Sequence, residues 1–206
     1  MKIRIASLVL ICLTLAAVPA VAQTIYSNGA INGNTDAWTI NFGFAVSDTF
    51  SLTSNSTVNG LNFGAWLFAG DILESTEVTI TSNEFGGTTY FDQQVNFTQS
   101  GCGTNQVGFN VCTETSSAFS GPTLNAGTYW LTLQNALVNT GDPVYWDESD
   151  GPSSASNVAL GTIGSESFTI LGSSSGGTGT TPEPASILLF GSGVVGVGVL
   201  LRRKLF

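Results

Sequence analysis

The segment from Val144 to Pro152 (VYWDESDGP) holds the densest group of side chains that could do chemistry. Three carboxylates, Asp147, Glu148 and Asp150, lie close together and precede a glycine. Clustered oxygen ligands on a loop are what Ca²⁺ prefers, although this spacing is not that of an EF-hand. A calcium site is therefore one hypothesis. The sequence favours the alternative, a solvated turn with an aromatic anchor in the core.

Aromatic residues beside polar ones raise a second hypothesis, carbohydrate binding. Sugars present apolar faces that stack on exposed indole or phenol rings. Tyr145 and Trp146 precede the carboxylates, and Trp130 alternates with Tyr129 and Leu131. Alternating residues of a strand point to opposite faces, so one of these faces must lie closer to solvent. Trp130 is the first candidate for an exposed platform, with Tyr145 and Trp146 as further candidates, although most tryptophans of a β-sandwich lie in the core.

The residue inventory removes several catalytic mechanisms. The chain has no histidine, so a Ser-His-Asp triad and an imidazole metal site are both excluded. No lysine lies in the middle of the chain to form a Schiff base there. Only carboxylates remain, such as Asp71 with Glu74 or the acidic segment described above, and two of them could form a glycosidase-like pair. We predict that the protein is not an enzyme and keep a small glycoside hydrolase as an alternative.

Cys102 and Cys112 are the two cysteines outside the N-terminal segment. The charged and then apolar start of the chain (residues 1–22) predicts export, and an exported chain meets an oxidising compartment, where pairing is the default. The alternative is two free thiols, but no nearby basic residue would lower a thiol pKa. We therefore predict a Cys102–Cys112 disulfide.

The distribution of charge excludes nucleic acid as a partner. All five basic residues lie at the two ends of the chain, and all 14 acidic residues lie between Asp36 and Glu183. The chain between Thr24 and Leu201 therefore carries a formal charge of −14. Such a body repels phosphate backbones and has no cation with which to release counterions.

Hydrophobic alternation predicts an all-β domain over residues 23–171. Apolar residues recur with period two, and clusters of Gly, Asn, Ser, Thr and Asp separate these segments. The alternating sets are Trp38, Ile40, Phe42 and Phe44; Phe50 and Leu52; Val78 and Ile80; Val107, Phe109 and Val111; Tyr129, Leu131 and Leu133; and Phe168 and Ile170. Residues 61–68 form a nearly continuous apolar run, as in a strand buried on both faces. Eight or nine short strands predict an antiparallel, jelly-roll-like β-sandwich.

The N-terminal 22 residues predict a signal peptide. Lys2 and Arg4 are followed by an apolar run from Ile5 to Leu15. Residues 20–22 (AVA) supply the small side chains that signal peptidase needs, so cleavage is expected before Gln23.

The C-terminal end predicts one transmembrane helix. Residues 172–181 (GSSSGGTGTT) have the composition of a flexible linker. Residues 185–201 are uncharged and apolar, just long enough to span a membrane. Arg202, Arg203 and Lys204 follow at once and are expected to stay cytoplasmic. The domain then lies outside the cytoplasm and the tip of the tail inside it, which is the topology that the signal peptide also predicts.

Pro182, Glu183 and Pro184 stand just before this apolar run. A Pro-Glu-Pro triplet, a short glycine-containing helix and an arginine cluster at the C-terminus resemble the PEP-CTERM sorting signal. The resemblance covers residues 182–206. The alternative interpretation of this segment is an ordinary C-terminal membrane anchor. It implies recognition of Pro182–Pro184 and the basic residues 202–204 by an exosortase-type enzyme, in bacteria that make exopolysaccharide.

The sequence thus predicts an exported protein, anchored in the inner membrane by its tail before sorting and then located at the cell surface or in the extracellular matrix. There we expect it to act as a matrix or carbohydrate-interacting component with exopolysaccharide as a partner. The first alternative is a calcium-dependent adhesin or structural module, and the second is the glycoside hydrolase. No cofactor is expected other than this calcium ion.

Overall fold

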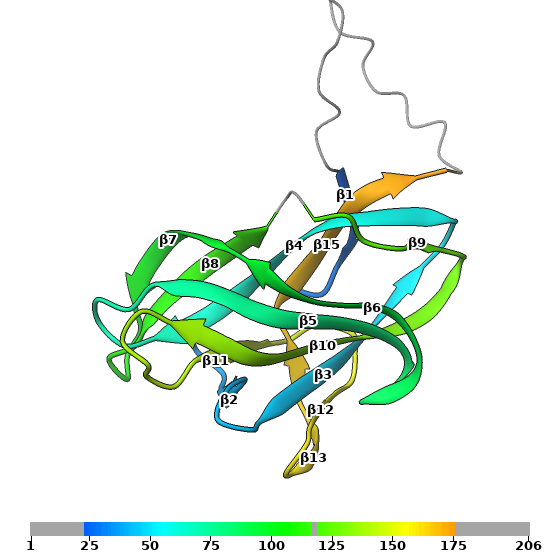
Figure 1. Ribbon diagram of the computed structural model, residues 1–206. Helices are drawn as coiled ribbons and strands as arrows, with labels where there is room; N and C mark the ends of the chain where they lie inside the picture. Colours follow the sequence, from blue (N-terminus) through cyan, green and yellow to red (C-terminus); the bar gives the residue numbers. More distant parts are fainter. Residues whose placement is uncertain (1–22, 117–118, 176–206) are drawn as a thin grey trace, which may run out of the picture. The chain divides into compact units, whose positions relative to one another are not determined.

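A computed structural model describes residues 23–116 and 119–175 of the chain, and every regular element in these ranges is a β-strand (Figure 1). The strands are β1 (Gln23–Ser27), β2 (Ala37–Thr39), β3 (Ala45–Leu52), β4 (Ser56–Leu67), β5 (Leu73–Asn83), β6 (Gly86–Asn96), β7 (Thr98–Thr104), β8 (Asn110–Ser116), β9 (Thr123–Leu124), β10 (Gly127–Val138), β11 (Tyr145–Ser149), β12 (Ala155–Asn157), β13 (Gly161–Ile163), β14 (Ser165–Glu166) and β15 (Phe168–Ser174). The described ranges contain no helix that could span a membrane. The predicted signal peptide (1–22) and sorting tail (182–206) lie outside them.

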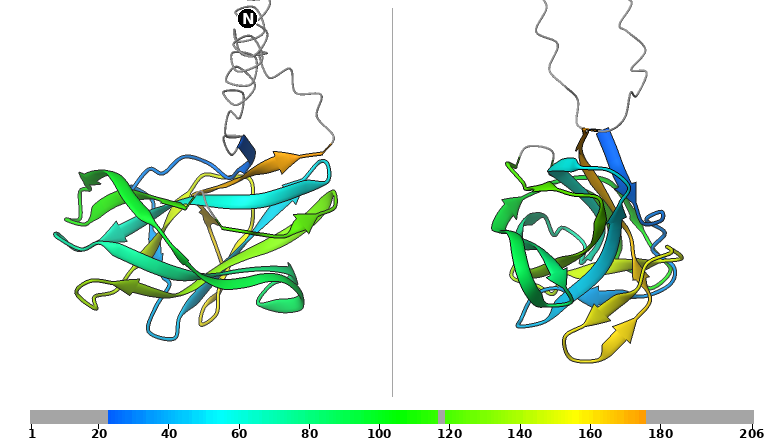
Figure 2. Two further views of the ribbon diagram at one scale, coloured as in Figure 1. Left: turned by 45° about the horizontal axis from the view of Figure 1, so that its top comes forward. Right: turned by 90° about the vertical axis from the view of Figure 1, so that its right-hand side faces the viewer.

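The strands form two antiparallel sheets, one of which curls into a half-barrel (Figure 2). The six-stranded sheet has the order β13-β12-β3-β10-β5-β6. In the nine-stranded sheet the long strand β4 is central: it pairs with β15 and β11, and also with β8 and β9. The prediction of an all-β fold with antiparallel sheets is confirmed.

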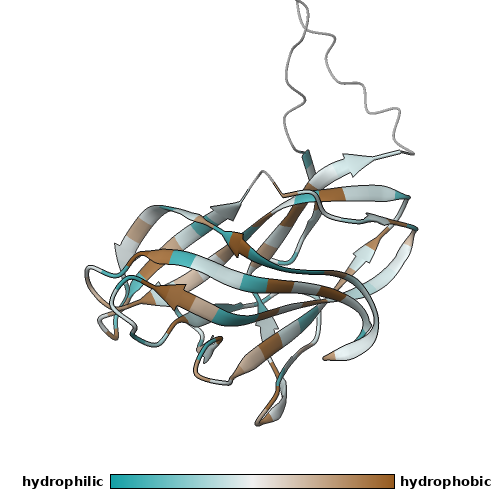
Figure 3. Cartoon of the chain, viewed as in Figure 1, coloured by the Kyte–Doolittle hydropathy of each residue, from teal (hydrophilic) through white to brown (hydrophobic). Residues whose placement is uncertain are grey.

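The core lies between the inner faces of the two sheets. In β10, Tyr129, Leu131 and Leu133 are buried, as their period-two spacing predicted. They meet large side chains of the opposite sheet, among them Phe63 of β4 and Phe168 of β15. Figure 3 shows the resulting alternation of apolar and polar residues along the strands. Burying each such side chain contributes about 1.5–3 kcal/mol, so this core is the main source of the domain's stability.

The predicted strand over residues 38–44 is wrong in its second half. β2 ends at Thr39, and residues 41–44 form a turn in which the Phe44 amide donates to the Asn41 carbonyl (3.0 Å). The central residues of the turn, Phe42 and Gly43, have φ values of 57° and 84°. The chain must leave the first sheet here and enter the second at β3, and the tight turn overrides the apolar alternation. Phe42 is left 64 % exposed.

Two further boundaries differ from the sequence prediction. Val107 lies in a turn before β8 and is 68 % exposed, because the β7–β8 hairpin reverses there. At the other end, β15 runs to Ser174, whereas the linker was predicted to begin at residue 172. Residues 172–174 pair with Val58, Thr57 and Ser56 of β4. Their bonds are made by the backbone, so a Gly/Ser composition does not prevent them.

The predicted disulfide between Cys102 and Cys112 is confirmed, and it joins β7 to β8. We expect Cys102→Ser to lower the free energy of unfolding by about 2–3 kcal/mol, because the unfolded chain regains the entropy of an open loop. Urea unfolding followed by tryptophan fluorescence measures this. Dithiothreitol should destabilise the wild-type protein by the same amount and leave the variant unchanged; a reductant-insensitive wild type would contradict the prediction.

Candidate functional site

Trp130 lies at the centre of the outer face of the six-stranded sheet. In the strand ladders it stands between Thr49 of β3 and Thr81 of β5. Its chain neighbours Tyr129 and Leu131 point into the core, so the indole must point to the other side. It is half-buried there, lying among the side chains of the neighbouring strands with part of its surface open to solvent.

The indole N–H of Trp130 has no hydrogen-bond partner among the described residues. The other three tryptophans donate theirs inside the protein: Trp38 Nε1 to Glu148 Oε2 (2.9 Å), Trp66 Nε1 to Asp147 Oδ1 (2.6 Å) and Trp146 Nε1 to the Ser167 carbonyl (2.9 Å). A tryptophan N–H usually finds a partner when it is buried. Trp130 is therefore the tryptophan of the domain whose donor remains free for an external acceptor.

Polar side chains surround Trp130 on this face. Ser51 and Thr128, both exposed, share a hydrogen bond (2.9 Å), whereas the Thr132 hydroxyl and the Ser47 hydroxyl to which it donates (2.9 Å) are buried. Further along the same strands, the Glu77 carboxylate accepts bonds from the amides of Gln134 and Asn135 (both 2.7 Å). The face thus combines one large aromatic ring with hydroxyl, carboxamide and carboxylate groups, and it carries no positive charge.

Tyr145 and Trp146, the other predicted ligand residues, point in opposite directions from β11. Trp146 is fully buried and contacts Phe63 and Phe168 in the core, which removes it from the candidate ligand-binding residues. Tyr145 is half-buried on the outer side of the nine-stranded sheet, where its ring packs against Phe109 (5.4 Å between centroids). Adjacent residues of a strand alternate between faces, so a Tyr-Trp pair cannot form one platform.

The three carboxylates predicted as calcium ligands do not converge. Asp147 is buried, and four protein donors occupy its two oxygens. Glu148 points to the other face of β11 and accepts the Trp38 N–H, while Asp150 is exposed. Within the described ranges no group of three or more His, Cys, Asp or Glu side chains could hold a metal ion.

Asp71 and Glu74, the carboxylates considered for a glycosidase-like pair, differ in their exposure to solvent. Asp71 is buried and accepts a hydrogen bond from the Thr140 hydroxyl (2.8 Å), whereas Glu74 is exposed on β5. A glycosidase pair must flank one bond of the sugar with both groups accessible. Asp71 does not meet that condition in this arrangement.

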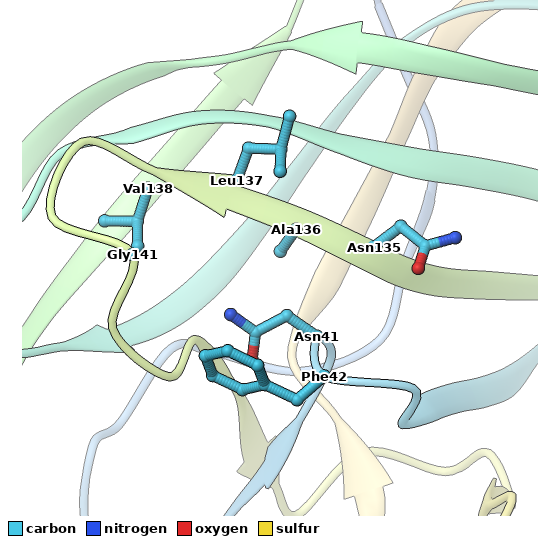
Figure 4. A pocket seen from close by; sticks show the side chains of 7 residues that line it. All are labelled: Asn41, Phe42, Asn135, Ala136, Leu137, Val138 and Gly141. Atoms are coloured by element: carbon cyan, nitrogen blue, oxygen red, sulfur yellow. The ribbon is translucent and has the colours of Figure 1, made fainter.

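A shallow pocket of about 240 Å³ opens beside the end of β10 (Figure 4). Its wall is formed by the exposed ring of Phe42, by residues 135–138 and by Gly141. The Asn41 side chain at its base is already bonded to the Asp142 carbonyl and the Val144 amide. The pocket therefore offers mainly apolar contact, because Asn41 is fully bonded and the Asn135 amide nitrogen already donates to Glu77.

Buried carboxylates that the sequence prediction missed form a second notable feature. Glu114 and Glu166 are both fully buried, and none of their four carboxylate oxygens has a hydrogen-bond partner among the residues that the structure describes. Burial raises the pKa of Glu114 to about 8 and the pKa of Glu166 well above its usual range. Asp48 is also buried, and burial raises its pKa to about 6 against the opposing effect of its hydrogen bonds.

Comparison with known sequences identifies the C-terminal segment. Residues 180–204 match the PEP-CTERM protein-sorting motif, which includes the predicted recognition residues Pro182, Glu183 and Pro184 and the basic cluster 202–204. Among curated proteins, no sequence matches the chain. The protein is thus an exported protein with a PEP-CTERM sorting signal, which marks it as a substrate of an exosortase-type enzyme.

Proposed function

We propose that this exported protein is a carbohydrate-interacting component of the cell surface or exopolysaccharide layer, and that it binds glycans on the outer face of the six-stranded sheet. The observation that carries the proposal is Trp130, half-exposed with a free indole N–H among hydroxyl, carboxamide and carboxylate groups. A ligand for this face must offer an apolar surface to the Trp130 ring and many hydroxyls to the polar side chains around it. Sugars have both features.

The charge of the domain supports the same class of ligand. No basic side chain lies between residues 23 and 175, so the face cannot recognise phosphate, sulfate or carboxylate groups by ion pairing. Neutral hydroxyls are the partners that Glu77 and the accessible threonines Thr49, Thr79 and Thr128 can bond, each for about 0.5–1.5 kcal/mol. The proposed ligand is therefore a neutral stretch of polysaccharide.

The strand order and the sorting signal fit this role. Four strands of each sheet follow the orders β1-β15-β4-β8 and β3-β10-β5-β6, which we interpret as a jelly roll, an architecture that also occurs in lectins. Gln23 pairs with Gly172, so the chain enters and leaves the domain side by side. We propose that the tail holds the protein in the inner membrane until an exosortase processes it, after which the domain joins the matrix.

The proposal is tested by titrating the exported chain, purified in detergent, with the host's exopolysaccharide and a glycan panel. Trp130→Ala should weaken binding by roughly tenfold or more, as the loss of an aromatic anchor does. Trp130→Phe keeps a ring and should bind with intermediate affinity.

The matched control is Phe42→Ala, which removes an exposed aromatic ring from the pocket in Figure 4 and should bind like the wild type. Melting temperatures of all variants separate lost binding from lost folding. Absence of binding to every glycan, or unchanged binding by Trp130→Ala, would contradict the proposal.

A further inference from the structure

Strand β6 lies at one end of the six-stranded sheet, next to β5 (Figure 1). One of its edges pairs with β5, and no described strand pairs with the other edge. An open strand edge presents a row of free backbone N–H and C=O groups, to which the strand of another chain can add. The open edge of β6 is therefore a place where a backbone partner could bind.

The other terminal strands of the two sheets are short or irregular. β2, β9, β13 and β14 have two or three residues each, and the pairings of β1 and β7 contain register shifts. β6 also has register shifts, but they lie before Phe91, and from Phe91 to Asn96 its pairing with β5 is regular. This stretch contains no lysine or proline, the residues that commonly protect an edge. Residues 91–96 are thus a regular and weakly protected edge.

The hydrogen bonds to β5 show which residues of β6 face the open edge. The Phe97 amide donates to the Glu74 carbonyl directly opposite (3.2 Å), which makes these two residues a hydrogen-bonded pair. Such pairs recur at every second residue of an antiparallel ladder. The other residues of β6 that bond to β5 in this way are Val95, Gln93 and Phe91. The backbone groups of Asp92 and Gln94 consequently point away from β5.

The side chains along this edge are polar on the outer face and apolar on the inner face. Asp92 and Gln94 are exposed on the outer face, opposite Thr79 and Glu77 of β5. Phe91 and Val95 are buried on the inner face, whereas Gln93, which lies between them, is exposed. An added strand would therefore meet polar partners on one face and continue the apolar core on the other.

We propose that two copies of this chain pair along β6 as antiparallel strands, about a two-fold axis at Gln93. Asp92 of each copy then exchanges backbone hydrogen bonds with Gln94 of the other copy. The two Gln93 residues lie opposite each other as a pair without hydrogen bonds. On the inner face, Phe91 of each copy stands opposite Val95 of the other.

The charge of Asp92 selects this register. Residues of the open edge must pair with one another, so the neighbouring registers place Asp92 opposite Asp92 or Gln94 opposite Gln94. The first brings two carboxylates together, which is destabilising, and the second puts Val95 opposite Gln93. With the axis at Gln93, the Asp92 carboxylate can accept a bond from the Gln94 carboxamide of the other copy. The edge is thus complementary to itself, which favours a second copy as its occupant.

This pairing would place two glycan-binding faces side by side. The two-fold axis of an antiparallel strand pair is perpendicular to the sheet, so the two six-stranded sheets continue into each other with their outer faces on the same side. Each outer face carries one Trp130. Two linked binding faces hold a repetitive polymer more tightly than one. This consequence rests on the proposed function, whereas the pairing of β6 does not.

Gln93→Cys tests the position of the axis. Opposite residues of a pair without hydrogen bonds have Cα atoms about 4.5 Å apart, which is within the range of a disulfide. The full chain carrying Gln93→Cys, exported by its host at about 0.15 M salt to screen the acidic domains from each other, should run mainly as a dimer on a non-reducing gel. Dithiothreitol should return it to the monomer. The matched control is Gln94→Cys, exposed on the same strand but opposite Asp92, and it should remain monomeric.

Two further substitutions, each combined with Gln93→Cys, test the contact with Asp92. Gln94→Glu should slow disulfide formation by roughly twofold to tenfold and Gln94→Lys should accelerate it, because the contact occurs twice in a two-fold dimer. A monomeric Gln93→Cys chain would overturn the proposal, and so would equal cross-linking of Gln94→Cys, which indicates random collisions or another register. The gels need no ligand, so this result is separate from glycan binding at Trp130, and either proposal can fail alone.

Discussion

Asp147→Asn is expected to lower the free energy of unfolding by roughly 3–5 kcal/mol, because the Asp147 carboxylate is a buried acceptor for four donors. Oδ1 accepts the Gly33 amide (2.9 Å) and Trp66 Nε1 (2.6 Å), and Oδ2 accepts the Asn32 amide (2.9 Å) and the Ser167 hydroxyl (3.1 Å). These bonds hold the segment between β1 and β2 against β4 and β11.

Asparagine has nearly the same shape as aspartate but offers only one oxygen. If its NH₂ group faces Gly33 and Trp66, two N–H donors lose their acceptor. If it faces Asn32 and Ser167, the Asn32 amide loses its acceptor, while the Ser167 hydroxyl can turn and accept. Urea unfolding followed by tryptophan fluorescence measures the loss, and hydrogen exchange at Asn32 and Gly33 should accelerate in the variant. Asp150→Asn, at an exposed position of the same segment, should change stability by less than about 0.5 kcal/mol. A loss below about 1 kcal/mol in Asp147→Asn would show that the four bonds do not act as described.

Strands that span the core could be predicted because their environment repeats every two residues. β3, β5, β10 and β15 each bury one face against the opposite sheet, so alternation marks them directly. The continuous apolar run of β4 has the same origin, since both of its faces are covered. The turn at Phe42 could not be predicted in this way. Its apolar spacing continues that of Trp38 and Ile40, while the need to change sheets is a property of the whole fold.

The same distinction holds for the candidate sites: alternation along a strand marks some of their residues, and only tertiary contacts bring the others together. Alternation separates Trp130 from its core neighbours but does not say which tryptophan lies on a covered face. For that reason Trp146 could be named both as a candidate ligand-binding residue and as an aromatic anchor of the core, and it lies in the core. Asp48 had a usable signal, because it stands between Val46 and Phe50 at core-facing positions of one strand. The partners of Asp48 had none: Asn28, Ser153 and Ser165 are brought to it by tertiary contacts between distant parts of the sequence.

The buried carboxylates should make the domain lose stability as the pH rises, which is the second large effect that we expect. Burial raises the pKa of Glu114 from 4.5 to about 8. Between these values the unfolded chain has released the proton that the folded state keeps, so the folded state binds more protons and stability falls with pH. The contribution is complete below about pH 4.5 and lost by about pH 8. Its slope is at most about 1.4 kcal/mol per pH unit, and the raised pKa values of Asp48 and Glu166 act in the same direction.

Glu114→Gln isolates one of these groups, because glutamine cannot ionise. The variant should match the wild type near pH 5 and be more stable by several kcal/mol at pH 9. Urea unfolding at intervals between pH 4 and pH 9 gives both curves, and Glu74→Gln, at an exposed position, should follow the wild type throughout. A wild-type curve that is flat between pH 5 and pH 8 would mean that Glu114 is ionised or hydrated in the folded protein. If the curve falls but Glu114→Gln leaves it unchanged, the proton that the folded state keeps belongs to Asp48 or Glu166 and not to Glu114.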